Sequence, residues 1–391
     1  MGYNSQLLII EQLDAGTGVG VIISPRYLGY DSACDYAKRY TDKGAVVLHD
    51  PEFYVPDSNQ GKLGSYPSAA LRASASALMK ISDSELDNWS KALEAENRNV
   101  GATAVIAPAL PYEAGRPDLV DLNSRLFEAA KRAGDAIGVP TLATVVVGQS
   151  GTTPSLIADM LSAPTALPAD GWFYQFEFQE ARLPNNEDEV FRFCIAALTL
   201  ACTDKPLLHS CAGPMSLLSF AVGATGSAIS FRQNLWGFER SKWLTPDGQG
   251  GGGNAPARFF SGTLWGTIVQ PDELILLSAP LRAAVLTHSP YSAAVASAPS
   301  LPWEKWTANK HMVHTIAAGA EKIAKHAHAR DAADAAINAL AQATKLHASI
   351  AAAGILLKDE TNTYQVPWRN ALQRALSDNA DDYKWLTDIG R

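Results

Sequence analysis

Charged residues are scarce in this chain, and the signatures of several protein classes are missing from it. Only 18% of the residues are charged while 47% are hydrophobic, which favours a large folded core over disorder. No apolar run approaches the roughly 18–20 uninterrupted residues of a membrane span. The first residues show no basic segment followed by an apolar core. We therefore expect a cytoplasmic protein with no membrane partner.

Cysteine and histidine are too few and too scattered to predict a metal site. The four cysteines have neither the Cys-x-x-Cys pairing nor the His/Cys spacing of structural zinc: Cys34, Cys194, Cys202 and Cys211. Five of the eight histidines fall in the C-terminal helical pattern, at 311, 314, 326, 328 and 347. We expect no metal, free thiols in a reducing compartment, and no cofactor that the sequence identifies.

Several catalytic and nucleotide-binding motifs are also absent. No Gly-x-Ser-x-Gly elbow occurs, no Gly-x-Gly-x-x-Gly follows the first predicted strand, and no Gly-Lys-Ser/Thr follows the glycine-rich segment 239–257. That segment is expected to be mobile, as a disordered surface loop, a lid or an anion cradle. The net charge of −8 argues against a general nucleic-acid binder and leaves only a local basic site for such a partner.

What is present is a repeat of short apolar runs, most of them followed by a helical pattern. The eight runs are 19–26, 45–51, 102–110, 139–150, 171–180, 206–213, 224–234 and 257–269. Eight alternating strands and helices are typical of an α/β fold of the (β/α)₈ TIM-barrel type. We predict a barrel domain over 1–280. An open, doubly wound sheet is the alternative.

The helices of this repeat are expected at 31–43, 82–99, 118–137, 154–163, 187–203 and 215–222. Ser82 followed by Glu85 predicts a capping box at the start of the second of these helices. Beyond the barrel, 281–391 is expected to hold an irregular connection and a helical extension, with an Ala-rich pattern over 309–353 that breaks near 329–331. A last helix is expected at 367–378. These helices offer a surface for homo-oligomer contact.

The fifth strand carries the sharpest functional signal. Its alternation places aromatic side chains on one face and Gln175, Glu177 and Gln179 on the other. In a barrel the aromatic row faces the helices, so the polar row lies in the interior, where it is costly unless paired or bound to a ligand. A purely structural hydrogen-bond network is the alternative.

The seventh strand follows the same logic, with Arg232 and Asn234 on the inner face. Arg232 either neutralises Glu177 or holds the carboxylate or phosphate of a substrate. We predict that Glu177 and Arg232 meet, because alternate strands contribute to the same layer of a barrel. A pair that must recover its desolvation cost is expected to serve ligand binding.

Other polar residues lie at strand ends. Asp50 ends the second strand and is a candidate acid, base or nucleophile, although Asp before Pro is also a common turn. His209 ends the sixth strand, where a structural role competes with a catalytic one. Arg26 and Arg258, at the end of the first strand and the start of the eighth, add positive charge. Convergence from separate strands is typical of barrel active sites.

The leading hypothesis is an enzyme, a hydrolase or glycosyl transferase, acting on a polar small molecule that carries a sugar, nucleoside or phosphate. Asp50 and Glu177 are the candidate carboxylates, with His209 beside them; Gln175, Gln179 and Asn234 orient the substrate, and the arginines bind an anionic group. A narrower form is base exchange on nucleic acid, as in the barrel transglycosylases, whose cysteine-based zinc cluster is absent here. The alternative is a non-catalytic barrel that binds a ligand or a protein.

Overall fold

A computed structural model of the chain describes residues 6–58, 61–179, 183–231, 236–244, 256–326, 329–358, 364–379 and 381. The chain divides into two compact units, which are described separately below. The first comprises Met1–Gln179, Thr199–Ser210 and Phe238–Gly251; the second comprises Glu180–Leu198, Cys211–Gly237 and Gly252–Arg391. The sequence 245–255, which includes the four glycines, and positions 232 and 234 lie outside the described residues.

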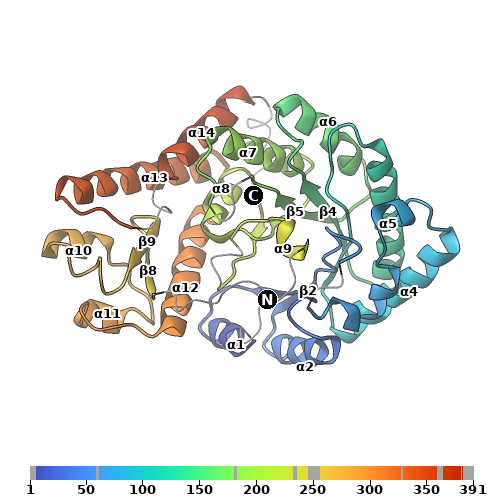
Figure 1. The fold of residues 1–391 in the computed structure, drawn as a ribbon, viewed down its shortest axis with the longest axis horizontal. Coiled ribbons are helices and arrows are strands. Elements are labelled where there is room, and N and C mark those ends of the chain that lie inside the picture. The colour runs from blue at the N-terminus through green and yellow to red at the C-terminus, as the bar shows by residue number, and fades with distance from the viewer. Residues whose placement is uncertain are drawn as a thin grey trace. The chain divides into compact units, whose positions relative to one another are not determined.

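The first unit is built on parallel strands that alternate with helices. Its strands are β1 (Gly20–Ile23), β2 (Val46–His49), β3 (Ala104–Ile106), β4 (Thr141–Val147), β5 (Gly171–Phe176) and β6 (Leu207–His209). Each pairs in parallel with the next. The sheet curls as part of a barrel does (Figure 1).

The helices of the first unit follow the predicted order. They are α1 (Gln6–Asp14), α2 (Tyr30–Thr41), α3 (Ala75–Leu78), α4 (Asp83–Asn99), α5 (Pro117–Ile137), α6 (Pro154–Thr165) and the short α9 (Ser241–Leu244), with 3₁₀ turns η1 (Leu63–Ser65) and η2 (Pro67–Leu71). The capping box of α4 is confirmed: the Glu85 amide donates to Ser82 Oγ at 3.3 Å, and the Ser82 amide donates to the Glu85 carboxylate at 2.8 Å.

The prediction of an eighth barrel strand over 257–269 is wrong. Its residues form an antiparallel hairpin in the second unit, β8 (Arg258–Ser261) and β9 (Gly266–Val269), as a separate two-stranded sheet. Between these strands, Trp265 adopts a left-handed φ of 49°, so the apolar run is folded back on itself by a turn. The larger sheet has seven strands in its order, ending with β7 (Gly226–Ser227), and the described residues contain no closed eight-stranded barrel.

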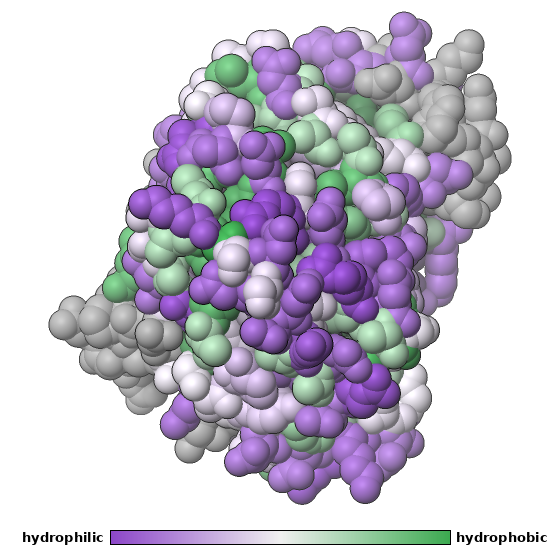
Figure 2. Space-filling view, turned by 90° about the vertical axis from the view of Figure 1, so that its right-hand side faces the viewer, coloured by the Kyte–Doolittle hydropathy of each residue, from purple (hydrophilic) through white to green (hydrophobic). Residues whose placement is uncertain are grey.

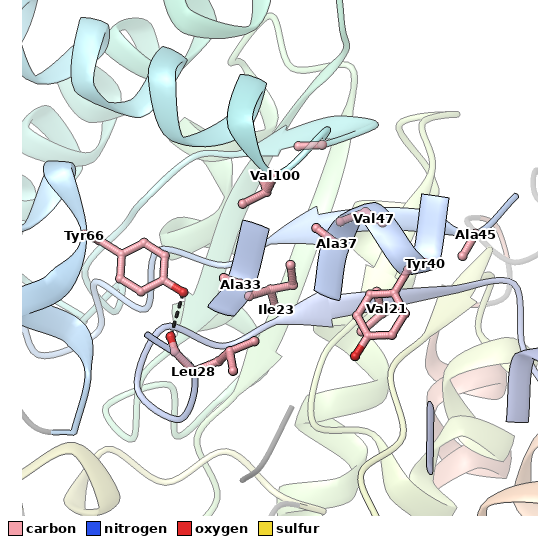
Figure 3. Close-up of a cluster of buried hydrophobic side chains, with 11 residues drawn as sticks. Val21, Ile23, Leu28, Ala33, Ala37, Tyr40, Ala45, Val47, Tyr66 and Val100 are labelled. Carbon is pink, nitrogen blue, oxygen red and sulfur yellow. Dashed lines mark hydrogen bonds between the residues drawn. The ribbon is translucent and has the colours of Figure 1, made fainter. Parts of the chain in front are cut away.

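Alternating side chains divide the core of the first unit into two layers. Between β1, β2 and α2, one layer gathers Val21, Ile23, Ala33, Ala37, Tyr40 and Val47 (Figure 3). Tyr66 closes that layer by donating its hydroxyl proton to the carbonyl of Leu28 at 2.7 Å. The strand residues of opposite orientation form the inner layer, which contains Leu48, Ala104, Ile106 and Phe173. Each fully buried Leu, Ile or Phe contributes roughly 1.5–3 kcal/mol.

The face that carries α4 and α5 is mainly hydrophilic, with hydrophobic side chains scattered over it (Figure 2). Exposed ion pairs join the two helices, such as Arg132 with Asp87 at 2.9 Å. Pairs of this kind contribute little to stability because water screens them. Across the described ranges, no helix combines the length and hydrophobicity that crossing a bilayer demands.

The second unit contains the predicted C-terminal helices. They are α12 (Lys305–Ala324), α13 (Ala329–Ala352) and α14 (Gln365–Asp378), and the connection before them holds α10 (Ala279–Val285) and α11 (Ala293–Ser297). The unit also includes η3 (Gly213–Met215) and α8 (Ser216–Ala221), while α7 (Glu187–Ala201) has residues in both units. Buried alanines line α13, and the Trp368 indole donates to the carbonyl of Pro184 at 2.7 Å.

Candidate functional site

Asp50 lies buried where β2 ends in the first unit. The chain turns back on this carboxylate: the Glu52 amide donates to Oδ1 at 2.9 Å, and the Tyr54 hydroxyl donates to Oδ2 at 2.5 Å. Glu52 adopts a left-handed φ of 49°, which is unfavourable for a residue with a Cβ and is common at functional sites. Burial, reinforced by the nearby Glu52, raises the pKa of Asp50 to about 7.

Glu52 connects this turn to the end of β1. Its carboxylate accepts hydrogen bonds from the Ser24 hydroxyl at 2.5 Å and from the Arg26 amide at 3.3 Å. Arg72 clamps the turn from another side by donating to the Pro51 carbonyl at 2.6 Å. The side chain of Arg26 is itself buried and lies over the ring of Tyr27. The Asp50 turn is thus fixed to β1 and to the segment before α3.

Gln175 joins the Asp50 turn to β5. Its Nε2 donates to the Tyr54 hydroxyl at 2.7 Å, so a buried chain of hydrogen bonds runs from Gln175 through Tyr54 to Asp50. Gln175 and Phe173 alternate with Tyr174, as the strand pattern predicts, and Phe173 belongs to the inner core layer. The polar residues therefore continue the inner apolar face at the carboxyl ends of the strands.

Glu177, two residues beyond Gln175, is another buried carboxylate. Its Oε1 accepts from Arg240 Nε at 2.9 Å and from the Arg240 amide at 3.3 Å, and Oε2 lies 2.7 Å from the same Nε in an ion pair. Arg240 reaches across to Glu113, where Nη2 donates to Oε1 at 2.7 Å. The predicted partner, Arg232, lies outside the described residues, so a Glu177–Arg232 pair stays a prediction.

Glu113 is itself held in place at the ends of β3 and β4. The hydroxyl and amide of Ser150 donate to its Oε2, at 2.5 and 3.4 Å. Gly148 lies directly against this carboxylate, because a Cβ added there would come within 2.5 Å of Glu113 Cδ. The ends of β2, β3, β4 and β5 therefore supply one group of buried and half-buried polar side chains within the first unit.

Three predicted residues lie away from this group. His209 stands beside Tyr174, on the face of β5 opposite Gln175, and burial lowers its pKa to about 3. Gln179 is exposed beyond the end of β5. Arg258 belongs to the hairpin of the second unit, where Nη1 donates to the Pro256 carbonyl at 3.4 Å. Asn234 lies outside the described residues.

Sequence reasoning missed Glu52, Tyr54 and Arg240. The first two lie two and four residues after Asp50. This spacing is visible in the sequence, but it predicts a contact with Asp50 only once the chain is known to turn there. Arg240 lies between two predicted strands, and no sequence pattern marks it as a functional residue. Among the described residues, no three His, Cys, Asp or Glu side chains are grouped as a metal site.

No protein-family model matches the chain, and no curated protein matches it significantly. What the site can do must therefore be argued from its own geometry.

Proposed function

We propose that the first unit carries the active site of an enzyme that performs acid–base chemistry on a polar small molecule. Hydrolysis or transfer of a glycosyl group is the reaction class that best fits two unlike carboxyl groups. The observation that carries this proposal is the buried chain from Asp50 through Tyr54 to Gln175, two residues before Glu177 on the same strand face.

The two carboxyl groups are suited to different roles. Asp50, with a pKa of about 7, keeps its proton for part of the time at neutral pH and is the proposed proton donor. Glu177 lies against the guanidinium of Arg240. It is the proposed carboxylate that stabilises the positive charge developing on the substrate or attacks the carbon atom that carries it. Gln175 and Tyr54 hold the donor in place. Arg26 and Glu52 fix the turn that carries it.

A specific observation favours a second candidate, a unit that binds a ligand without transforming it. Both oxygens of Asp50 already accept hydrogen bonds from the chain, and Glu177 already has an ion-pair partner. Polar residues that are paired with one another in this way also fit a structural role. Either candidate is compatible with cysteines that form no disulfide in the described part of the chain, as in a reducing compartment.

The test is a screen of the full chain against aryl glycosides, nucleosides and sugar phosphates, read as turnover and as a shift in unfolding temperature. Asp50→Asn and Glu177→Gln preserve side-chain volume and should lower kcat by roughly 10²–10⁴-fold on any substrate found. Asp87→Asn, on the solvent face of α4, is the control and should leave kcat unchanged. Full activity of both site variants would refute the proposal; binding without turnover would establish the second candidate.

The pH profile adds an independent criterion. If Asp50 donates the proton, kcat should fall as the pH rises through about 7, because the donor form is then lost. A rate that is constant from pH 6 to pH 8 would exclude Asp50 as the donor.

A further inference from the structure

The guanidinium of Arg240 fills a cradle composed of hydrogen-bond acceptors. Glu113 and Glu177 each accept from it. Gln175 shares the strand face of Glu177, and its Oε1 is buried with no hydrogen-bond partner in the described part of the chain. The Tyr54 hydroxyl donates its proton to Asp50, so it accepts a hydrogen bond from Nε2 of Gln175. The Oε1 of Gln175 therefore does not bond to Tyr54. Such a set of oxygens calls for a group with several N–H donors.

The Glu113 side of the cradle is held in place without help from Arg240. Ser150 orients Glu113 through its hydroxyl and its amide, and the Ser150 hydroxyl oxygen accepts in turn from the Ala114 amide at 2.7 Å. The missing side chain of Gly148 provides the room that the Glu113 carboxylate occupies. A binding group fixed in advance by its neighbours loses little conformational entropy when a ligand arrives.

Arg240 is also the part of the cradle that solvent reaches most easily. Its side chain is 31% exposed, against 18% for Glu113 and 4% for Glu177. Its backbone amide donates to Glu177 independently of the side chain, so the guanidinium can turn outward while that bond stays in place. Two carboxylates left at this depth would favour another cation or take up a proton, because an unpaired buried charge is costly.

We propose that the Glu113–Glu177 cradle binds the cationic group of a ligand, a guanidinium or a primary ammonium, in the place of the Arg240 side chain. A guanidinium fits best, because its planar fork spans two carboxylates. This inference rests on the proposed function in that it names a substrate class for the same site. Binding does not require Asp50, so it can be tested apart from turnover.

The experiment measures binding of methylguanidinium chloride to the full chain by calorimetry and by unfolding temperature. Tetramethylammonium chloride at the same concentration is the control cation without N–H donors. The variants are Arg240→Ala, Arg240→Ala with Glu113→Gln, Asp50→Asn, and the matched control Arg132→Ala, which removes an exposed arginine from its ion pair with Asp87.

Methylguanidinium should bind Arg240→Ala at least tenfold more tightly than the wild type, in which the tethered guanidinium competes at an effective concentration on the order of millimolar. Glu113→Gln should weaken that binding at least tenfold, while Asp50→Asn and Arg132→Ala should bind as the wild type does. Saturable binding to the wild type is also required, because the proposal is that the ligand displaces the Arg240 side chain from the cradle. No binding to the wild type at any concentration that leaves it folded, or equal binding of tetramethylammonium, would overturn the inference. Loss of turnover in Asp50→Asn with cation binding retained would separate the two proposals.

Discussion

The hydroxyl of Tyr54 donates to Oδ2 of Asp50 at 2.5 Å while it accepts from Gln175 at 2.7 Å. This single oxygen therefore ties the turn after β2 to the end of β5. Because the hydroxyl favours the ionised form of Asp50, it moderates the rise in pKa that burial imposes. The protonation of Asp50 is thus set by a contact between segments distant in sequence.

Tyr54→Phe removes the hydroxyl, and with it the hydrogen bonds to Asp50 and from Gln175, and keeps the ring. The pKa of Asp50 should rise above about 7, because the hydrogen bond that favours its ionised form is lost. The chain should also lose about 1–2 kcal/mol of stability. Carbon-13 titration of the Asp50 carboxyl group and urea unfolding measure the two effects. Tyr36→Phe, on the helix α2, is the control, and an unchanged Asp50 pKa in Tyr54→Phe would contradict the role given to Tyr54.

Glu96 on α4 should make the wild type less stable as the pH rises. Burial raises the pKa of Glu96 to about 7 in the folded chain, above its ordinary value of 4.5. The folded state therefore holds a proton that the unfolded state has lost, and stability falls between about pH 4.5 and pH 7. Glu96→Gln retains an acceptor for the Ser68 amide, and its stability relative to the wild type should grow over that range and then level off.

Urea unfolding at pH 4.5, 6 and 8 checks this prediction. The neighbouring His49 has its pKa lowered to about 3 by burial, so it stays neutral in the folded state over this range and affects both proteins alike. Arg72, the nearby cation, stays charged. The stability difference between Glu94→Gln, on the same helix, and the wild type should not change with pH. A difference for Glu96→Gln that is also independent of pH would show that Glu96 titrates normally.

Gly148→Ala should disturb the Glu113 carboxylate. The added methyl group would lie within 2.5 Å of Glu113 Cδ, so one of them must move, at a cost of roughly 1–3 kcal/mol. Gly64→Ala is the matched control, because nothing lies within 4 Å of a Cβ at that position. Unfolding temperatures of the two variants provide the comparison. Equal temperatures would mean that Glu113 is not confined by Gly148.

Ser82→Ala should destabilise the first unit through the start of α4. The change removes the acceptor of the Glu85 amide, a loss worth about 0.5–2 kcal/mol at a helix N-cap. Ser84→Ala, within the first turn of the same helix, keeps the capping box and should cost little. Chemical denaturation of both variants tests the difference, and equal stabilities would show that the box contributes nothing.

Local signals in the sequence predicted the elements of the first unit well. Period-two alternation assigned Gln175 to the inner face and Tyr174 to the other, and the spacing of Ser82 and Glu85 predicted a helix start, because each depends only on neighbouring residues. The parallel strands and intervening helices are confirmed as far as β6. The run 257–269 misled because its apolar content hides a turn, and content alone does not distinguish one strand from a hairpin.

Partner choice was beyond the reach of the sequence. Alternation placed Glu177 inward, but whether its cation is Arg240 or another arginine depends on how a segment 63 positions away returns to the strand ends. The left-handed turn at Glu52 is similarly a product of its surroundings, since a glutamate has no local preference for that conformation. His209 faces away because the register of β6 against β5 pairs it with Tyr174.

The bare backbone at Gly148 has a consequence for tracing the ancestry of this chain. A descendant that keeps the Glu113 carboxylate where it now lies cannot accept even one methyl group at 148, whatever else drifts around it. Glutamate after the third strand, Gly-x-Ser after the fourth and glutamate at the end of the fifth should thus be inherited together or lost together. That joint pattern, rather than overall sequence similarity, is what would identify distant homologues.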